Sequence, residues 1–454
     1  MENILCYARP WNKEQFSRLV KEIDPASNLI LCSEHASTDE SGLREEYYKI
    51  LKNNSVLDTG VIPEISKAQA LDVISRCRLL RSLKRQTAER HLIAMTLAIK
   101  SVFRERKVDS VFSLTVDSYI MDLMRILSKH YEIRFIGIIG TFVNGHFRVT
   151  SRGEVTTNKD PEVNFAELVG PKLLSPEYTP AFNAKSIKSP IKSVYRRWVA
   201  NTARIPFFFL KRHLTGDAYN YHYWASQLVA QENFNFLPPR DPGRHDWEDF
   251  IQKEKKPSLL IPLQMFPECT VDYWCEDSGV IKYYEMLEKT IEKLCDDFFI
   301  FLKEHPSVMG VRPSGFYSKI KKDPRVIVIP TYTPSNYILE KIDGVVVWTG
   351  SVGFEALLRG KAVLGLATPF YASGHRFRKI SLSTPNNEIV KHVTSCAESK
   401  ITKDEQKHVL DKLGSQLYKG NFKNDKSWAK ESLSDLNDTS AMALSIRKTL
   451  SRSK

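Results

Sequence analysis

The chain has 454 residues, of which 42% are hydrophobic and 26% charged, and its formal net charge is +13 at pH 7. These values are typical of a globular protein with two or three domains, and they exclude a disordered chain. The N-terminus lacks the basic and apolar regions of a secretory signal, and no apolar run approaches the ~20 residues of a membrane span, so we expect a cytoplasmic protein.

Short runs of β-branched and aromatic residues alternate with amphipathic helical patterns in the first part of the chain. The pattern predicts a helix over 117–130, because apolar residues recur between Ile120 and Leu127 at i, i+3, i+4 and i+7. Strands that alternate with helices are typical of parallel sheets covered on both faces. The expected strands are residues 4–7, 29–32, 110–114 and 135–139.

A basic segment follows, with no acidic residue between Glu177 and Asp217. Its lysines and arginines are interleaved with apolar residues, among them Trp198 and the run 205–210. Basic residues with aromatic anchors favour a helix that lies on an anionic membrane surface. A linker helix that packs its aromatic residues on the protein is the alternative, and no motif supports nucleic-acid binding. The basic residues are Lys185, Lys188, Lys192, Arg196, Arg197, Arg204, Lys211 and Arg212.

The second half of the chain repeats the alternation after a proline-rich stretch at 237–243, and it includes a helix over 281–294. We therefore predict the α/β fold class, with two Rossmann-like domains facing a cleft. The expected strands are 258–262, 298–302, 326–329, 344–348 and 362–366. The expected domains are 1–180 and 251–400, with a basic and aromatic linker at 181–250 and C-terminal helices at 401–454 whose return to the first domain is left open.

Several nucleotide and metal motifs are absent from the sequence. There is no P-loop string, no G-x-G-x-x-G, no H-E-x-x-H and no G-x-S-x-G. No two aspartates are spaced D-x-D, the pair with which metal-dependent glycosyltransferases hold their ion, and the seven cysteines form no C-x-x-C pair. We therefore expect no metal and no cofactor, and a phosphate bound by backbone amides and a few side chains.

One candidate string is Lys303-Glu304-His305-Pro306, which directly follows an expected strand. Ligands of parallel sheets bind at the carboxyl ends of the strands. In that position His305 donates a hydrogen bond to a phosphate, Lys303 adds charge, and Pro306 stiffens the turn. A loop histidine that caps the next turn is the alternative.

The second candidate string, residues 347–363, carries a turn with two glycines and two hydroxyls between an expected strand and an expected helix. A helix that begins near Val352 or Gly353 presents unpaired N–H groups to an anion. The Glu355 carboxylate, one turn on, accepts hydroxyls of a ribose or sugar. Alternatively, Ser351 is an N-cap and Glu355 a first-turn acid. The donor-binding candidates are Lys303, Pro306, Thr349, Gly350, Ser351, Val352, Gly353 and Glu355.

These strings together resemble the bacterial capsule polysaccharide synthesis proteins, which include Kdo transferases. The resemblance rests on K-x-H-P, on T-G-S-V-G-F-E-A-L-L-x-G-K-x-V and on P-F-Y-x-x-G, and it is specific over residues 258–375. It includes Gln264 and Glu268 in an element similar to P-L-x-x-x-P-E. The histidine and serine elements are also similar to those of bacterial sialyltransferases, which use CMP-activated sugars without a metal. The resemblance implies the GT-B fold.

The same resemblance implies an inverting, metal-independent transfer from CMP-Kdo or a similar donor. Amides near Ser351 and Gly353, with Lys303 and His305, would neutralise the leaving phosphate. The first domain would supply the acceptor site and a general base. The base candidate is Asp117, for which N-capping is the alternative, and its rivals are Glu34, His35 and His146. The catalytic candidates are thus Asp117 and His305, and the acceptor or cleft candidates are Gln264, Glu268 and His146.

The expected partners are a nucleotide-sugar donor, with a CMP-sugar favoured, and a glycan or glycolipid acceptor. We also expect an anionic membrane surface, on which a cytoplasmic protein lies peripherally at the inner membrane, and no nucleic acid. Two other functions remain open on the same architecture. One is a nucleotide-sugar epimerase, and the other is a non-catalytic polysaccharide assembly subunit.

Overall fold

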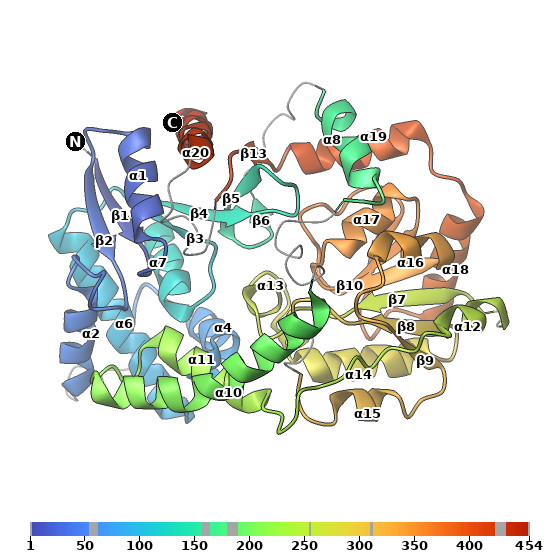
Figure 1. Ribbon diagram of the computed structural model, residues 1–454. Helices are drawn as coiled ribbons and strands as arrows, with labels where there is room; N and C mark the ends of the chain where they lie inside the picture. Colours follow the sequence, from blue (N-terminus) through green and yellow to red (C-terminus); the bar gives the residue numbers. More distant parts are fainter. Residues whose placement is uncertain are drawn as a thin grey trace. The chain divides into compact units, whose positions relative to one another are not determined.

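The computed structural model describes residues 2–53, 62–156, 164–178, 189–253, 256–308, 312–422 and 433–452 (Figure 1). The chain forms two compact units. Unit 1 comprises residues 1–157, 215–225 and 416–454, and unit 2 comprises residues 158–214 and 226–415. The chain therefore crosses between the two units more often than the expected domain boundaries imply. A piece of the expected linker and the last residues of the chain both belong to unit 1.

Unit 1 is built on a seven-stranded sheet with the order β13-β5-β4-β3-β1-β2, in which β6 also pairs with β5. The strands β1 to β4 are parallel to one another, whereas β5 pairs antiparallel with β4, β6 and β13. The strands are β1 (Asn3–Tyr7), β2 (Asn28–Cys32), β3 (Ser110–Leu114), β4 (Arg134–Gly140), β5 (His146–Arg152), β6 (Val155–Thr156) and β13 (Tyr418–Lys419).

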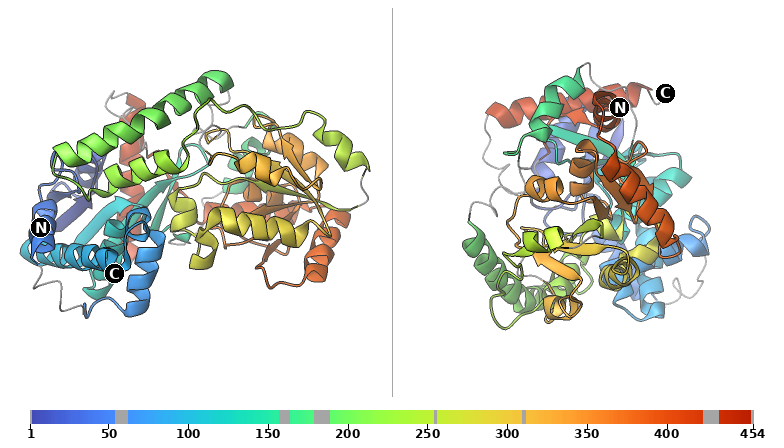
Figure 2. Two further views of the ribbon diagram at one scale, coloured as in Figure 1. Left: turned by 90° about the horizontal axis from the view of Figure 1, so that it is seen from below. Right: turned by 90° about the vertical axis from the view of Figure 1, so that its right-hand side faces the viewer.

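Helices cover both faces of this sheet (Figures 1 and 2). On one face, apolar residues of α1 and α20 join those of the strands in a single core cluster that includes Phe16, Phe112 and Ile446. The helices of unit 1 are α1 (Lys13–Ile23), α2 (Leu43–Lys52), α4 (Lys67–Arg76), α5 (Arg78–Arg81), α6 (Arg85–Glu105), α7 (Tyr119–His130) and α20 (Leu433–Arg452), and α11 (Tyr221–Glu232) begins in unit 1 and ends in unit 2.

Unit 2 is built on a six-stranded sheet with the order β12-β11-β10-β7-β8-β9, and every pair of neighbours is parallel. Alternate residues of its strands face opposite sides, so that Leu259 and Ile300 join a core with Leu287 of α14 and Val393 of α18. The strands are β7 (Ser258–Pro262), β8 (Phe299–Lys303), β9 (Val326–Ile329), β10 (Gly344–Val347), β11 (Ala362–Gly365) and β12 (Phe377–Lys379).

The helices of unit 2 again lie on both faces of their sheet (Figures 1 and 2). They are α8 (Phe165–Leu174), α10 (Pro190–Leu214), α12 (Trp247–Lys253), α13 (Cys269–Asp272), α14 (Tyr283–Leu294), α15 (Phe316–Ile320), α16 (Ser335–Lys341), α17 (Val352–Leu358), α18 (Asn386–Glu398) and α19 (Lys403–Gly414), with a 3₁₀ turn η1 (Ser278–Ile281).

The predicted fold class, α/β with two Rossmann-like domains, is confirmed by these two sheets. All nine expected strands are present, and each end lies within one residue of its expected position. A cleft between the two domains stays a prediction.

Candidate active site

Each sheet has one place where its strand order reverses. In unit 2 the chain runs from β7 outward to β8 and β9, and then returns to the other side of β7 with β10 and β11. The loops that follow β7 and β10 therefore diverge at their carboxyl ends, where open α/β sheets bind ligands. Gln264 lies just beyond β7, and the turn 348–351 lies just beyond β10. The second candidate string thus begins at the edge of the unit 2 sheet where open α/β sheets commonly bind ligands.

The turn after β10 is fixed by contacts on both sides. The indole of Trp348 donates to the Val280 carbonyl at 3.3 Å, and the Thr349 hydroxyl donates to the Thr270 carbonyl at 3.1 Å. The Tyr371 hydroxyl donates to the Gly350 carbonyl. Because a Cβ atom at position 353 would lie 2.3 Å from the Tyr371 hydroxyl oxygen, only glycine fits there. The turn is therefore held in one shape before any ligand binds.

This turn leaves fewer free amides than the sequence suggests. The N–H of Gly353 donates to the Gly350 carbonyl at 3.1 Å, so it is already used within the turn. Ser351 occupies the N-cap position of α17, but its side chain makes no capping hydrogen bond. The Ser351 hydroxyl is thus available to a ligand, whereas the amide of Gly353 is not.

The Gln264 side chain lies against this turn from the neighbouring loop. A Cβ atom at Gly350 would come within 2.8 Å of its Nε2 atom, and the residue is 6% exposed. Its backbone N–H donates to the Tyr283 hydroxyl at 2.8 Å, but no hydrogen bond of its side-chain amide occurs within the described ranges. Buried polar groups without partners are uncommon, so this amide is suited to bind a ligand.

Lys303 ends β8, the strand next to β7, and is also 6% exposed. Its ammonium has no hydrogen bond or ion pair in the part of the chain that the structure describes. Burial lowers the pKa of Lys303 to about 8, against the opposing effect of the Glu355 and Glu304 carboxylates. Burial likewise raises the pKa of Glu355. An incoming phosphate would give Lys303 the strong counter-charge that it lacks.

His305 is arranged as a neutral hydrogen-bond donor. Its Nδ1 atom accepts the Ser307 N–H at 3.1 Å, so the ring proton lies on Nε2. Burial and the nearby Lys303 ammonium lower the pKa of His305 to about 3. The Pro306 carbonyl accepts a hydrogen bond from the Arg197 side chain of α10 at 2.8 Å, and this contact fixes the turn that carries His305. The contact with Ser307 is of the kind expected from the alternative, in which His305 caps the following turn, and it leaves Nε2–H for the proposed phosphate contact.

A buried ion pair that the sequence did not reveal supports both loops. Arg312 donates to both carboxylate oxygens of Glu304, at 2.8 and 2.7 Å, and to the Gln264 carbonyl at 2.7 Å. Glu304 also accepts the His305 N–H at 2.6 Å and the Tyr317 hydroxyl. The pair therefore couples the loop after β7 to the loop after β8.

We expect Arg312→Met to lower the free energy of unfolding by about 3–5 kcal/mol, because Glu304 would be left buried without its counter-charge. Urea unfolding followed by circular dichroism measures this change. The double variant Glu304→Gln/Arg312→Met removes both charges and should recover part of the loss. Equal losses in the single and double variants would show that the charge is not the cause.

The reversal in unit 1 lies between β1 and β3, because β2 flanks β1 on one side while β3 and β4 follow on the other. Arg9 follows β1 and Asp117 follows β3. The Arg9 guanidinium donates to both carboxylate oxygens of Asp117, at 2.8 and 2.9 Å, and its Nε atom lies 3.3 Å from Glu34 Oε1. Asp117 is not the N-cap of α7, since Ser118 takes that position. It faces Arg9 instead, with its side chain 26% exposed.

Aromatic and histidine side chains border this ion pair. The ring of Trp11 lies 4.8 Å from that of His222 and 6.0 Å from that of His35, centroid to centroid. The Tyr221 hydroxyl donates to the Asp117 carbonyl at 2.7 Å. Carboxylates beside aromatic faces suit a polyhydroxylated ligand, since the carboxylate accepts hydroxyls and the ring covers apolar atoms.

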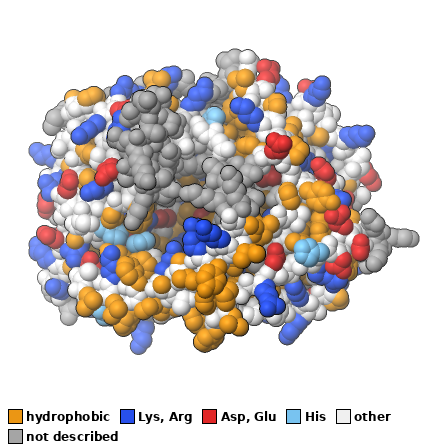
Figure 3. All heavy atoms as spheres, viewed as in Figure 1, with side chains coloured by type: hydrophobic (Ala, Val, Ile, Leu, Met, Phe, Trp, Pro, Cys, Tyr) orange, Lys and Arg blue, Asp and Glu red, His pale blue; other side chains and the backbone are white. Residues whose placement is uncertain are grey.

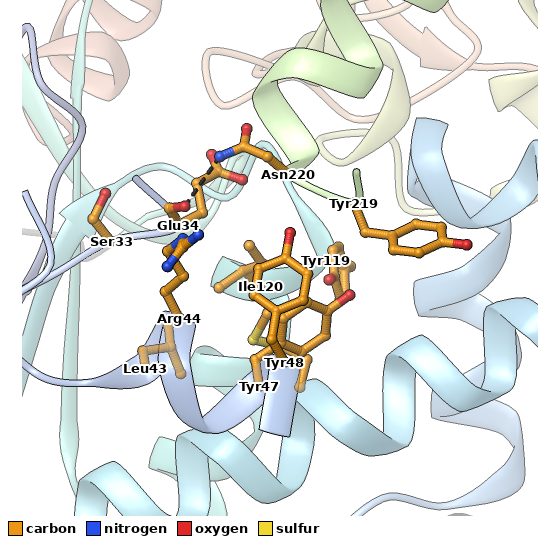
Figure 4. Close-up of a pocket in the computed structure, with 11 residues that line it drawn as sticks. Ser33, Glu34, Leu43, Arg44, Tyr47, Tyr48, Tyr119, Ile120, Tyr219 and Asn220 are labelled. Atoms are coloured by element: carbon orange, nitrogen blue, oxygen red, sulfur yellow. Dashed lines mark hydrogen bonds between the residues drawn. The ribbon is translucent and has the colours of Figure 1, made fainter. Parts of the chain in front are cut away.

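A small pocket adjoins this group inside unit 1. Glu34 and Arg44 lie on one side of it, and the tyrosines lie on the other (Figure 4). Burial raises the pKa of Glu34, and the Arg9 guanidinium opposes that shift. The tyrosines are Tyr47, Tyr48, Tyr119 and Tyr219.

Two further acceptor candidates lie on other loops. His146 begins β5, beyond β4 and β3 from the reversal in unit 1, and its Nδ1 atom lies 3.2 Å from the Asn144 carbonyl oxygen. The Glu268 carboxylate accepts the Thr270 hydroxyl at 2.8 Å at the start of α13. Because the Thr270 carbonyl accepts the Thr349 hydroxyl, Glu268 is linked to the turn after β10 through Thr270.

Two kinds of feature are absent from the described residues. They contain no group of three or more His, Cys, Asp or Glu side chains arranged to hold a metal ion. They also contain no helix that is long and apolar enough to cross a membrane.

The fold defines an α/β protein with two Rossmann-like units, and each unit carries polar side chains at the reversal point of its sheet. Residues 197–374 match the family model described as capsule polysaccharide biosynthesis protein. This segment contains both candidate strings, and the resemblance predicted from them is confirmed.

Individual relatives match only in part. The capsule polysaccharide modification protein LipA of Neisseria meningitidis serogroup A is 27% identical over 131 residues, which are 29% of this chain and 18% of the relative. The chain therefore matches less than a fifth of the length of that relative. The serogroup B protein gives the same values.

Two solved structures show weak similarity. The β-Kdo 2,7-transferase KpsC of Thermosulfurimonas dismutans is 13% identical, with 96% of this chain and 100% of that chain covered and a TM-score of 0.38. The UDP-GlcNAc 2-epimerase of Methanocaldococcus jannaschii is 10% identical, with 90% and 98% covered and a TM-score of 0.31. At such low sequence identities and TM-scores, neither structure supports a conclusion beyond the family match.

Proposed function

We propose that this protein is a glycosyltransferase that uses a nucleotide-activated sugar, CMP-Kdo or a similar donor, in bacterial capsular or surface polysaccharide biosynthesis. The observation that carries the proposal is the group of side chains at the ends of β8, β7 and β10. Lys303 and Gln264 are buried there, and their side chains make no hydrogen bond to any residue that the structure describes. They lie next to the turn after β10, within the segment that matches the capsule family.

The charge of this group supports a CMP-sugar. The phosphate of a CMP-sugar carries one negative charge and gains a second as the sugar leaves. Lys303 supplies one positive charge, and neutral His305 supplies a hydrogen bond from Nε2 without adding another. Donors placed where charge develops stabilise the transition state more than the ground state. The Thr349 and Ser351 hydroxyls and the Glu355 carboxylate are proposed to hold the rest of the donor.

Transfer is proposed to invert the anomeric centre by direct displacement. The acceptor, a glycan or glycolipid, is assigned to unit 1, where Asp117 takes the proton of its hydroxyl. The two-point hydrogen bond from Arg9 fixes the plane of the Asp117 carboxylate, and the Asp117 side chain is 26% exposed. Gln264 is better placed for the donor than for the acceptor, because it contacts the turn after β10.

We further propose that the protein works in the cytoplasm and lies peripherally on the inner membrane. The support is the net charge of +13 and the acid-free basic segment before Asp217. Lys185 and Lys188 of that segment lie outside the described residues.

A panel of nucleotides scored by thermal unfolding tests the donor site. We expect CMP at 100 times its dissociation constant to add about 2.7 kcal/mol to the free energy of unfolding. Because Lys303 and His305 are proposed to hold the phosphate without a metal ion, the shift should be the same in EDTA as in Mg²⁺. A shift that vanishes in EDTA and returns with Mg²⁺ or Mn²⁺ would contradict metal independence. Stabilisation by UDP but not by CMP would contradict the choice of donor.

A further inference from the structure

The helix α10 turns an apolar face to solvent along most of its length. Residues at positions 191, 195 and 199, and again at 206 and 210, follow the i, i+4 spacing that places side chains on one face. Monomeric proteins seldom expose such a row of large apolar side chains. The exposed fractions are Ile191 86%, Tyr195 56%, Val199 45%, Phe207 55%, Phe209 49%, Leu210 53% and Leu214 82%.

Basic side chains flank this row. Lys192, Arg196 and Arg204 are exposed, and α10 contains no acidic residue. Figure 3 shows hydrophobic side chains next to Lys and Arg side chains where α10 crosses the view. A helix with this composition buries its apolar side chains among lipid acyl chains while its cations contact anionic headgroups.

The opposite face of α10 is bound to unit 2. The Trp198 indole donates to the Asn235 carbonyl at 2.8 Å, Asn201 donates to the Asn233 carbonyl at 3.2 Å, and Arg212 donates to the Gln227 side chain at 2.6 Å. Trp198, Arg197 and Arg212, which the sequence grouped with the surface segment, therefore face the protein. Their contacts fix which side of the helix faces outward.

A second exposed apolar segment follows the residue that Trp198 contacts. Phe236 and Leu237 follow Asn235 directly and are 86% and 78% exposed. We call the outward side chains of α10 together with Phe236 and Leu237 the docking face. The docking face thus combines exposed apolar side chains from two separate segments of unit 2. The exposure of one helix alone would not account for the second segment.

The chemistry of the docking face favours one occupant. A second copy of the chain would place cations against cations, which is unfavourable. A nucleic acid would pair with the cations, but it offers little to the aliphatic side chains of Ile191, Leu210 and Leu214. An anionic lipid bilayer satisfies both kinds of side chain.

We propose that the docking face lies in the headgroup region of an anionic lipid bilayer and holds the protein on that membrane. The inference rests on the membrane localisation given under Proposed function and identifies the surface responsible. It does not depend on the transferase activity.

Flotation of the full-length protein with lipid vesicles tests this inference. The vesicles contain phosphatidylcholine alone or with phosphatidylglycerol, at low and high salt. We expect binding only with phosphatidylglycerol, and weaker binding at high salt because mobile ions screen the headgroups. Lys192→Glu/Arg196→Glu/Arg204→Glu should weaken binding by at least fivefold for each residue changed. The triple variant Ile191→Ser/Phe209→Ser/Phe236→Ser should abolish the vesicle binding that remains at high salt.

The matched control is Lys391→Glu/Lys400→Glu/Lys403→Glu, which changes the same charge at exposed positions elsewhere in unit 2. It should retain most of the binding, and all variants should keep the unfolding temperature of the natural protein. A natural protein that ignores anionic vesicles at low salt would overturn membrane localisation itself. If the α10 variants and the control weaken binding equally, the protein binds by general charge and the docking face is refuted.

Discussion

Replacement of His305 by alanine should lower kcat by about 10² or more, the loss seen when one transition-state donor is removed. His305 Nε2–H is the donor, because Nδ1 already accepts the Ser307 N–H. Since the pKa of His305 is lowered to about 3, the ring is neutral from pH 5 to 8, and no step near its ordinary pKa should appear in the rate profile. Steady-state kinetics and a thermal melt of the variant measure both effects.

Two further variants separate the donor from the turn that carries it. His305→Asn keeps an acceptor near the position of Nδ1 but lacks the Nε2 donor, so it should be as slow as the alanine variant. His305→Gln places an amide nearer to Nε2 and should recover part of the rate. Unchanged turnover in the alanine variant would remove His305 from the mechanism.

The second large effect is expected for Asp117→Asn, which should lower kcat by about 10²–10⁴ because the general base is lost. The amide keeps the shape of the carboxylate, so the acceptor KM should change much less than kcat. Asparagine cannot accept both hydrogen bonds from Arg9 as a carboxylate does, so a stability measurement must accompany the kinetics.

Glu34→Gln is the matched control for Asp117, since Glu34 also contacts Arg9. The Glu34 side chain is 4% exposed and has little access to an acceptor, whereas that of Asp117 is 26% exposed. We expect Glu34→Gln to alter stability more than kcat. A loss of kcat confined to Glu34→Gln, with Asp117→Asn near normal, would make Glu34 the base instead.

The sheets could be predicted from the sequence because buried parallel strands are continuous apolar runs. Residues 258–262 and 326–329 are of this kind, and they form β7 and β9. The strand β5 was missed because His146–Arg152 mixes charged, polar and apolar residues in an antiparallel position. The short strands β12 and β13 offer too few residues for a pattern.

The two halves of the candidate site differed in how well they could be predicted from the sequence. The proposed donor side could be predicted because its candidate residues are concentrated in two contiguous strings around His305 and Ser351. The proposed acceptor side depends on Arg9, Glu34 and Asp117, which the fold brings together only at the reversal between β1 and β3. A lone arginine near the N-terminus carries no periodicity or motif, and so Arg9 had no signal in the sequence.

Other structural features depend on contacts between distant segments, which the composition of the chain does not predict. The sequence showed that α10 would be basic and aromatic, but the contacts of Trp198 and Arg212 determine which side faces outward. The role of Arg312 likewise could not be predicted from the sequence, because it depends on contacts with Glu304 and with the loop after β7.

The most direct test of the central claim is the release of nucleotide from CMP-Kdo, with and without a capsular glycan acceptor. The account predicts that CMP release is accelerated by the acceptor, that the sugar appears on the acceptor, and that His305→Ala lowers the rate of both by about 10² or more. Turnover of a UDP-sugar to its epimer without any acceptor would identify an epimerase instead. Binding of the glycan without nucleotide release from CMP-Kdo or other CMP- and UDP-sugars would contradict enzymatic activity and identify an assembly subunit.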